Sequence, residues 1–261
     1  MPAELTPTEA AKRAAARRAA RMVESGMVVG LGTGSTAAHL IDALAAMARE
    51  EGLEIACVAT SERSGTLAAL AGLDVIDIGR APRIDIAIDG ADEFDAGLSL
   101  IKGGGGALLR EKIVATAAER MVVIADASKE VRQLGAFPLP VEVIPFGWEA
   151  TRRQLQDAMA SIDVMGREAV LRMDGDAPYR TDGGNHIIDL HLKRIANPWQ
   201  TAMVINQVPG AVENGLFVDV CDVAVIGGAD GGVELRDAAA GTSMREPPEE
   251  DGDNLFRDVA D

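Results

Sequence analysis

Apolar strand-like runs alternate with segments of helical period through the first half of the chain. The runs are "MVVGL", "EIACVAT", "LDVIDI" and "IDIAIDG", and helical segments begin at Ser35 and after Ser61. Strands that alternate with helices form parallel sheets, because each crossover helix returns the chain to the starting edge. The later runs "MVVIAD" and "DVAVIGGADG" are apolar on both faces, as strands buried in such a sheet are. The pattern predicts an α/β fold with a Rossmann-like, mostly parallel sheet.

The order of elements changes near residue 134, where three prolines in "FPLPVEVIPFG" interrupt the alternation. A strand "PVEVIP", a helix over 148–162, strands "EAVLRM" and "HIIDLHL", a helix from Pro198 and a strand "NGLFV" follow. This β-α-β-β-α-β order is typical of a ferredoxin-like unit. We therefore expect an α/β catalytic domain from residues 1–134 plus 218–236, with a smaller α+β domain, 135–217, inserted in it.

The two ends of the chain differ in composition. Near the N-terminus, Thr6 as cap, Pro7 and Glu9 predict the start of an ordinary helix, with Gly26 as its stop. The charges scattered through this segment argue against a secretory signal. Residues 237–261 are acidic and almost without apolar periodicity, so we expect a disordered tail with no catalytic role.

Charge and cysteine content limit the classes of partner. The formal net charge of -16 repels nucleic acid and anionic membranes, so neither is expected as a partner. No apolar run approaches the roughly 20 residues of a membrane-spanning helix. Cys57 and Cys221 lie in apolar runs without metal-ligand neighbours, which favours a reduced protein in the cytoplasm.

The loop "GLGTGSTA" fits the G-x-G-x-x-A pattern of dinucleotide sites. A dinucleotide site also needs an acid at the end of the second strand, but "EIACVAT" ends in Thr60 and its acid, Glu54, stands at the other end. The loop's hydroxyl groups suit a single phosphate or a sugar better. The alternative is a tight turn in which Ser35 caps the following helix. The residues that would contact a ligand are Thr33, Gly34, Ser35 and Thr36.

Acidic residues follow the buried strand "IDIAIDG" at the sheet edge where ligands bind in open α/β folds. A turn explains Asp89-Gly90, but it does not require Asp92 or Glu93 as well. We therefore favour a functional role for Asp89 and Asp92, and less so for Glu93. Gly90 and Ala91 belong to the same segment.

The segment "KGGGGALLREK" is the most specific feature of the chain. Four consecutive glycines are costly in conformational entropy, and they indicate a backbone that something approaches closely. Amides at the start of a helix, with a lysine before them, form an anion or oxyanion site. Glu111, in the following helix, could remove a proton from a carbon next to a carbonyl. The alternative for Glu111 is an exposed helix acid in a surface ion pair. The candidate residues are Lys102, Gly103, Gly104, Gly105 and Glu111.

Other polar residues carry weaker signals. Lys129 in "DASK" follows another strand and could reach the same cleft, and Lys12 on the first helix is ambiguous among its arginines. The three histidines, His39, His186 and His191, are not spaced as metal ligands, and we expect no metal site.

Taken together, "GLGTGSTA", "DGADE", "KGGGGALLREK", "ADASK" and "FPLPVEVIP" resemble ribose-5-phosphate isomerases of the A type over roughly residues 8–236. The resemblance implies metal-independent, cofactor-free interconversion of D-ribose 5-phosphate and D-ribulose 5-phosphate in the non-oxidative pentose phosphate pathway. It also implies a homodimer or homotetramer. By resemblance, Glu111 carries the proton of a cis-enediolate mechanism, Asp89 assists ring opening and Lys102 stabilises the enediolate. The substrate-binding positions fall on Thr33–Thr36, Asp89–Asp92, Lys102–Gly105, Lys129 and Lys12.

Two other functions remain open at this point. A sugar-phosphate deaminase or lactonase on a related fold would need a catalytic histidine near the cleft, and the histidines here are poorly placed for it. A non-catalytic sugar-phosphate sensor would not need Glu111 and would be expected to carry a DNA-binding helix-turn-helix.

Overall fold

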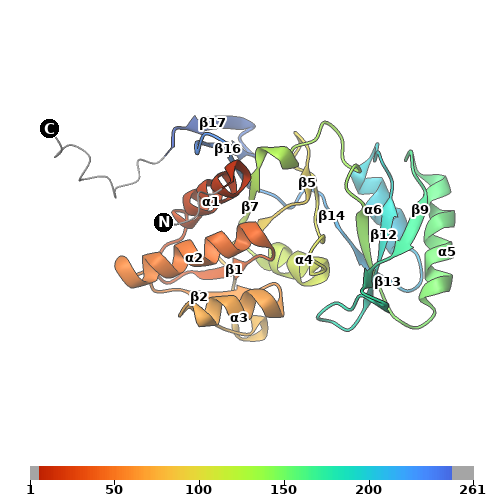
Figure 1. Ribbon diagram of the computed structural model, residues 1–261, viewed down its shortest axis with the longest axis horizontal. Coiled ribbons are helices and arrows are strands. Elements are labelled where there is room, and N and C mark those ends of the chain that lie inside the picture. Colours follow the sequence, from red (N-terminus) through yellow and green to blue (C-terminus); the bar gives the residue numbers. More distant parts are fainter. Residues whose placement is uncertain (1–5, 249–261) are drawn as a thin grey trace.

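An eight-stranded sheet forms the centre of the larger part of the molecule (Figure 1). The computed structural model describes residues 6–248. The six strands from β15 to β3 are mutually parallel, whereas β16 and β17 add an antiparallel hairpin at one edge. The strand order is β17 (Thr242–Glu246), β16 (Val233–Asp237), β15 (Val223–Gly227), β7 (Met121–Asp126), β4 (Ile86–Gly90), β1 (Val28–Leu31), β2 (Ala56–Ala59) and β3 (Asp74–Val75).

Helices cover both faces of this sheet. One face is covered by α1 (Pro7–Ala20), α2 (Ser35–Glu50) and α3 (Glu62–Leu70). Their side chains pack with every second residue of the strands, such as Val29. Helix α4 (Leu108–Ala117) packs on the other face. Thr6 caps α1 through the amide of Glu9, as predicted, but the helix ends at Ala20, well before Gly26. None of the helices within residues 6–248 has the length and apolar character needed to cross a membrane.

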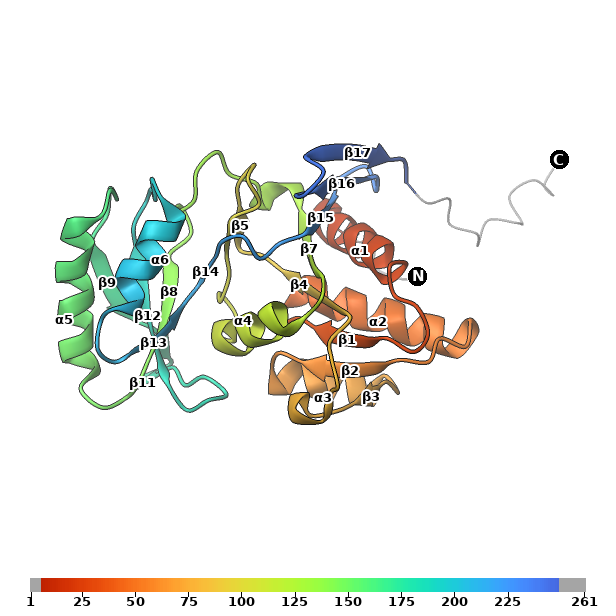
Figure 2. The ribbon, with the colours of Figure 1, turned by 180° about the vertical axis from the view of Figure 1, so that it is seen from behind.

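A second, four-stranded antiparallel sheet lies at one end of the molecule, with the large sheet toward the other (Figure 2). Its chain segment lies between β7 and β15, which are neighbours in the large sheet. The order 4-1-3-2 and the two helices are those of a ferredoxin-like unit, and the unit has its own apolar core. The elements are β8 (Leu139–Val143), α5 (Trp148–Ala158), β9 (Glu168–Leu171), β12 (His186–His191), α6 (Pro198–Asn206) and β13 (Ala211–Asn214), with a small hairpin of β10 (Met173–Asp174) and β11 (Ala177–Pro178).

The predicted last strand of this unit, "NGLFV", is wrong in position. The fourth strand is β13, which ends at Asn214, and the next residue, Gly215, donates its amide to the Pro140 carbonyl and accepts from the Lys102 amide. Leu216–Phe217 form β14 instead, in a three-stranded sheet with β6 (Leu100–Ile101) and β5 (Glu93–Phe94). This connection joins the small sheet to the segment that precedes the glycine run.

The prediction of disorder from residue 237 onward is wrong for β17. This strand pairs with β16 over its whole length, and the Glu246 carboxylate accepts hydrogen bonds of 2.6 and 3.0 Å from Arg18 of α1. Composition did not reveal the strand because its side chains are almost all exposed, so backbone pairing rather than apolar burial holds it. Residues 249–261 of the predicted tail lie outside the described residues.

We expect a chain ending at Asp237 to be less stable than one ending at Pro248, because β16 would lose the strand paired along one of its edges and Arg18 would lose its bonds to Glu246. Urea unfolding should show a loss of about 1–3 kcal/mol in the free energy of unfolding. Equal unfolding midpoints for the two truncated chains would show that β17 adds no stability.

Candidate active site

All the predicted site residues except Asp89 and Gly104 line one pocket of about 130 Å³. The pocket lies beyond the carboxyl ends of β1, β4 and β7, where open α/β sheets bind ligands. Glu111 lies at its wall although it comes from α4, on the far side of the sheet from α2. The lining residues are Lys12, Thr33, Gly34, Ser35, Thr36, Gly90, Ala91, Asp92, Lys102, Gly103, Gly105, Glu111 and Lys129.

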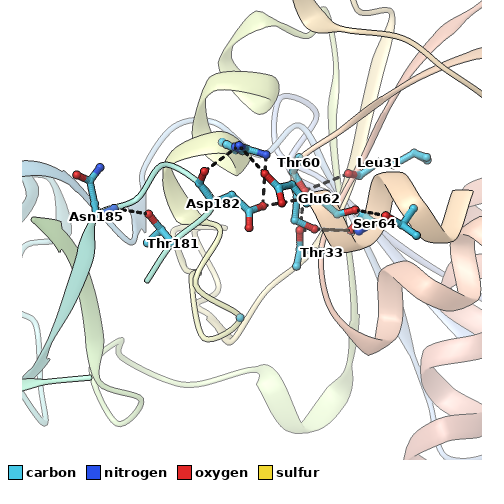
Figure 3. Close-up of polar contacts among 12 residues, drawn as sticks. Leu31, Thr33, Thr60, Glu62, Ser64, Thr181, Asp182 and Asn185 are labelled. Carbon is cyan, nitrogen blue, oxygen red and sulfur yellow. Dashed lines mark hydrogen bonds and ion pairs between the residues drawn. The ribbon is translucent and has the colours of Figure 1, made fainter. Parts of the chain in front are cut away.

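The loop after β1 presents the start of α2 to the pocket. Gly34, not Ser35, is the N-cap, with φ of 105°, and no side chain caps the helix. The amides of the first turn are therefore available to an anion. The Thr33 hydroxyl lies 2.8 Å from that of Thr60, and Ser64 donates to the Gly32 carbonyl (Figure 3). These contacts fix the loop from β2 and α3.

Asp89 is buried at the end of β4 and is held on both carboxylate oxygens. Its Oδ1 accepts hydrogen bonds from the amides of Thr33 at 3.0 Å and Gly90 at 2.7 Å. Its Oδ2 lies 2.9 Å from Lys102 Nζ. A Cβ at Gly32 would stand 2.0 Å from Asp89 Oδ1, so the loop glycine leaves room for this carboxylate.

The ammonium group of Lys102 stands between two carboxylates in the interior. Its Nζ donates to the Gly90 carbonyl at 2.5 Å and lies 3.4 Å from Glu111 Oε2, and the side chain is 3% exposed. Burial alone would lower the pKa of Lys102, but the charges of Asp89 and Glu111 outweigh it and raise this pKa. Lys102 therefore stays charged across the physiological range.

Glu111 is a buried acid and not the exposed helix residue of the alternative interpretation. Because α4 begins at Leu108, Glu111 lies in the first turn of the helix, close to the glycine run. Burial raises the pKa of Glu111 to about 8, against the opposing effect of Lys102 and with the help of the Asp89 charge. Its Oε2 accepts no hydrogen bond from the described residues. A carboxyl group in this state can both accept and return a proton near neutral pH.

The glycine run fits between the two sheets. Gly103 and Gly106 have φ of 101° and 82°, which other residues rarely adopt. A Cβ at Gly106 would stand 2.2 Å from the Tyr179 hydroxyl. The Gly104 amide donates to Asp92 Oδ2 at 2.7 Å, which places Asp92 beside the run.

The loop after β11 joins the small sheet to α3 and α4. Asp182 Oδ2 accepts from the Glu62 amide at 2.8 Å and from Arg110 at 3.3 Å, as part of the polar contacts in Figure 3. Arg110 also donates to the Asp182 carbonyl at 3.2 Å. Arg110 precedes Glu111 on α4, so these bonds tie the helix that carries the buried acid to α3.

The two weaker lysine candidates also lie at the pocket. Lys12 Nζ donates to Ser35 Oγ at 3.1 Å and to Glu9 at 2.7 Å. Lys129 ends the short 3-10 turn after β7 and lines the pocket from that side. Glu93 turns away from the site, because its carboxylate accepts the amides of Gly135 and Phe137. Within residues 6–248 no cluster of His, Cys, Asp and Glu is arranged to hold a metal ion.

Comparison with known sequences identifies the family. The family model described as ribose 5-phosphate isomerase A (phosphoriboisomerase A) matches residues 56–231. The ribose-5-phosphate isomerase A of Ruegeria pomeroyi is 59% identical to this chain, and the match covers 100% of both. The chain belongs to the ribose 5-phosphate isomerase A family. The predicted resemblance and the isomerase class are confirmed, and the sensor, deaminase and lactonase alternatives lose their support.

Solved structures of this family share the fold. The ribose 5-phosphate isomerase A of Methanocaldococcus jannaschii aligns with a TM-score of 0.80 at 40% identity, covering 87% of this chain and 97% of that one. A D-ribose-5-phosphate isomerase in complex with phospho-erythronic acid aligns with a TM-score of 0.81 at 37% identity, covering 88% and 99%. The predicted fold class is therefore confirmed.

The sequence did not reveal the residues that support the site by holding its loops in place. Thr60 and Ser64 hold the first loop, and Arg172 and Tyr179 contact the glycine run. No local motif marks Arg172 and Tyr179, and the pattern "TSERS", which contains Thr60 and Ser64, is typical of a helix cap, so the contacts of these residues with distant segments were not visible in the sequence. Gly32 was visible within the loop motif, but its contact with Asp89 was not.

Gly32→Ala should disable the site, because the new Cβ must push Asp89 away from Lys102. We expect kcat to fall about 100-fold, as a shift of about 1 Å in a site group can cost. Gly65→Ala on α3, where a Cβ would meet only Ala59 at 3.4 Å and Val75 at 4.0 Å, is the matched control and should keep its activity. Steady-state kinetics checks both, and an active Gly32→Ala enzyme would contradict this account.

Proposed function

We propose that the protein interconverts D-ribose 5-phosphate and D-ribulose 5-phosphate in the pocket that contains Glu111, through a cis-enediolate. The observation that carries the proposal is the buried acid with its raised pKa beside a buried ammonium group. Such an acid suits a step in which one group takes a proton from a carbon and returns it to the next. A relative binds phospho-erythronic acid, a phosphorylated sugar acid, which supports a sugar phosphate as the ligand.

Glu111 carries the proton in this mechanism. Its carboxylate removes the proton from C2 of the open-chain aldose, and the electrons form the enediolate with negative charge on the oxygens. The hydroxyl proton moves from O2 to O1 of the enediolate, and the protonated Glu111 returns its proton to C1, so that the ketose results. Because one group serves both steps, its pKa must lie near the working pH, as burial here ensures.

Lys102 and the glycine amides stabilise the negative charge of the enediolate. The Lys102 ammonium lies 3.4 Å from Glu111 Oε2, so it stands near the carbon from which Glu111 takes its proton. Preorganised donors in a site shielded from water are the largest single source of rate in many enzymes. Asp89, held at 2.9 Å from Lys102, assists the opening of the furanose ring.

The phosphate binds at the N-terminus of α2. This helix start has no side-chain cap, and the Ser35 and Thr36 hydroxyls can add donors. Lys12 and Lys129 bring positive charge to the pocket wall. These local donors offset a net charge of -16, which would otherwise repel an anionic substrate.

The reaction as proposed uses no cofactor and no metal, since Glu111, Lys102 and the amides supply the proton transfer and charge stabilisation. We also propose that the protein works in the cytoplasm, as a homodimer or homotetramer. Support for assembly comes from large apolar side chains exposed on the small unit, including Phe146 at 90%, Met165 at 69% and Trp199 at 61%.

Glu111→Gln should remove the proton carrier and leave the shape of the pocket. In a coupled assay with ribose 5-phosphate and a chelator, we expect kcat to fall at least about 1000-fold, as for loss of a general base. Phospho-erythronic acid should still bind, as measured by calorimetry. Glu50→Gln, at an exposed position on α2, is the control. Near-normal turnover by the Glu111 variant would refute the assignment, and loss of wild-type activity in chelator would refute the metal-free scheme.

The pH dependence of kcat/KM should report the ionisation of Glu111. Only the carboxylate can accept the proton, so activity should rise with pH and level off near the pKa of about 8. Below that midpoint we expect about a tenfold fall per pH unit. Measurement above about pH 6.5 avoids most of the titration of the substrate phosphate, whose pKa is about 6. A flat profile over this range would contradict the raised pKa.

A further inference from the structure

Three successive carbonyl groups of the glycine run are bound from the small sheet. Arg172 Nη1 donates to the carbonyls of Gly103 at 2.9 Å and Gly104 at 3.1 Å. The Tyr179 hydroxyl donates to the Gly105 carbonyl at 3.2 Å. The run is therefore held on the side away from the ligand pocket by groups that the sequence places about 70 residues later.

The guanidinium group of Arg172 is itself fixed. Its Nε and Nη2 donate to the two carboxylate oxygens of Asp189 on β12, at 2.9 and 2.5 Å. A two-pronged pair of this kind defines the orientation of the guanidinium plane. The guanidinium carbon also lies 5.8 Å from the centre of the Tyr179 ring, within cation–π range. Arg172 thus links the position of the glycine run to that of the small sheet.

The geometry of the peptide group then determines where the glycine amides point. In a trans peptide the N–H of one residue points opposite to the carbonyl of the residue before it, and no cis peptide occurs in the described chain. The Gly104 amide, opposite the Gly103 carbonyl, accordingly meets Asp92 at the pocket. The Gly105 amide is opposite the Gly104 carbonyl, and within residues 6–248 it has no hydrogen-bond partner. Gly105 lines the pocket, so its amide is a donor available to a ligand.

A cation on the carbonyl of a peptide group also changes the amide of that group. It draws electron density toward the oxygen, and the N–H becomes a stronger donor because hydrogen bonds in a chain polarise one another. Arg172 on the Gly104 carbonyl therefore both orients and strengthens the Gly105 amide. Tyr179 acts on a different peptide, since the amide opposite the Gly105 carbonyl is that of Gly106, which donates to Gly103 within the turn.

We propose that Arg172, fixed by Asp189, is a positioning residue that sets the Gly105 amide as the donor to an enediolate oxygen. This inference rests on the proposed isomerisation in the same pocket. It adds a role for the small sheet in the reaction, exerted through the backbone and without contact between Arg172 and the substrate.

The test compares turnover with binding in variants of Arg172. Arg172→Ala should lower kcat about 10- to 100-fold, somewhat less than direct loss of an oxyanion donor, and change KM less than about threefold. Millimolar guanidinium chloride should restore part of the activity of this variant and leave the wild-type rate unchanged. Arg172→Lys should be intermediate, because an ammonium group cannot bind both carbonyls and Asp189 at once.

Two matched control variants test whether the effect of Arg172 is specific to the Gly105 amide or follows from any lost contact near the glycine run. Tyr179→Phe removes a bond to the same run but not from the Gly105 peptide, so its kcat should fall less than about threefold. Arg180→Ala removes an exposed arginine whose hydrogen bond within residues 6–248 is to the Gly184 carbonyl, and its kcat should not change. If Arg172→Ala proves unfolded by thermal melting, Asp189→Asn, which keeps the shape and loses the anchor, should show the same selective loss of kcat.

Unchanged kcat in a folded Arg172→Ala enzyme would overturn the inference, and so would equal losses in Arg172→Ala and Tyr179→Phe. An effect of Arg172→Ala on KM alone would also overturn the inference, because it would show that Arg172 contributes to substrate binding. These outcomes are distinct from failure of the proposed function, which would appear as an active Glu111→Gln enzyme or as a wild-type protein without isomerase activity.

Discussion

The ammonium group of Lys102, buried between Asp89 and Glu111, is the interaction on which the rest of the site depends. A charge in the interior is tolerated only when opposite charges and hydrogen bonds compensate it. Here the compensation comes from two carboxylates and one carbonyl, of which Asp89 and Gly90 lie at the end of β4 and Glu111 lies on α4. The same arrangement leaves Glu111 incompletely neutralised, since Lys102 is shared with Asp89. The result is a charged lysine beside an acid whose pKa is raised.

This arrangement requires segments from both sheets. The end of β4 supplies Asp89, the strand pair β6–β14 leads into Lys102, and α4 supplies Glu111. The small sheet then fixes the backbone between Lys102 and Glu111 through Arg172, and it fixes α4 through Asp182. The small unit thus contacts both the backbone that follows the lysine and the helix that carries the acid.

Much of the site could be predicted because many of its residues belong to short local motifs. A glycine run before a helix, or acids after a strand, constrain the backbone within a few residues, and such constraints are visible in sequence. Elements held by distant partners could not be predicted in this way. The exposed strand β17 depends on pairing with β16, and the end of the small sheet depends on the backbone bonds of Gly215.

The sequence by itself determined the parallel sheet, the ferredoxin-like order and which residues meet at the carboxyl ends of the strands. Alternation of apolar runs and the positions of glycines are enough for this, because parallel strands bring their ends to one edge. Only the tertiary structure decided the chemical state of those residues. A pKa depends on burial and on neighbouring charges, and only folding removes water from Glu111 and brings Lys102 to 3.4 Å from it.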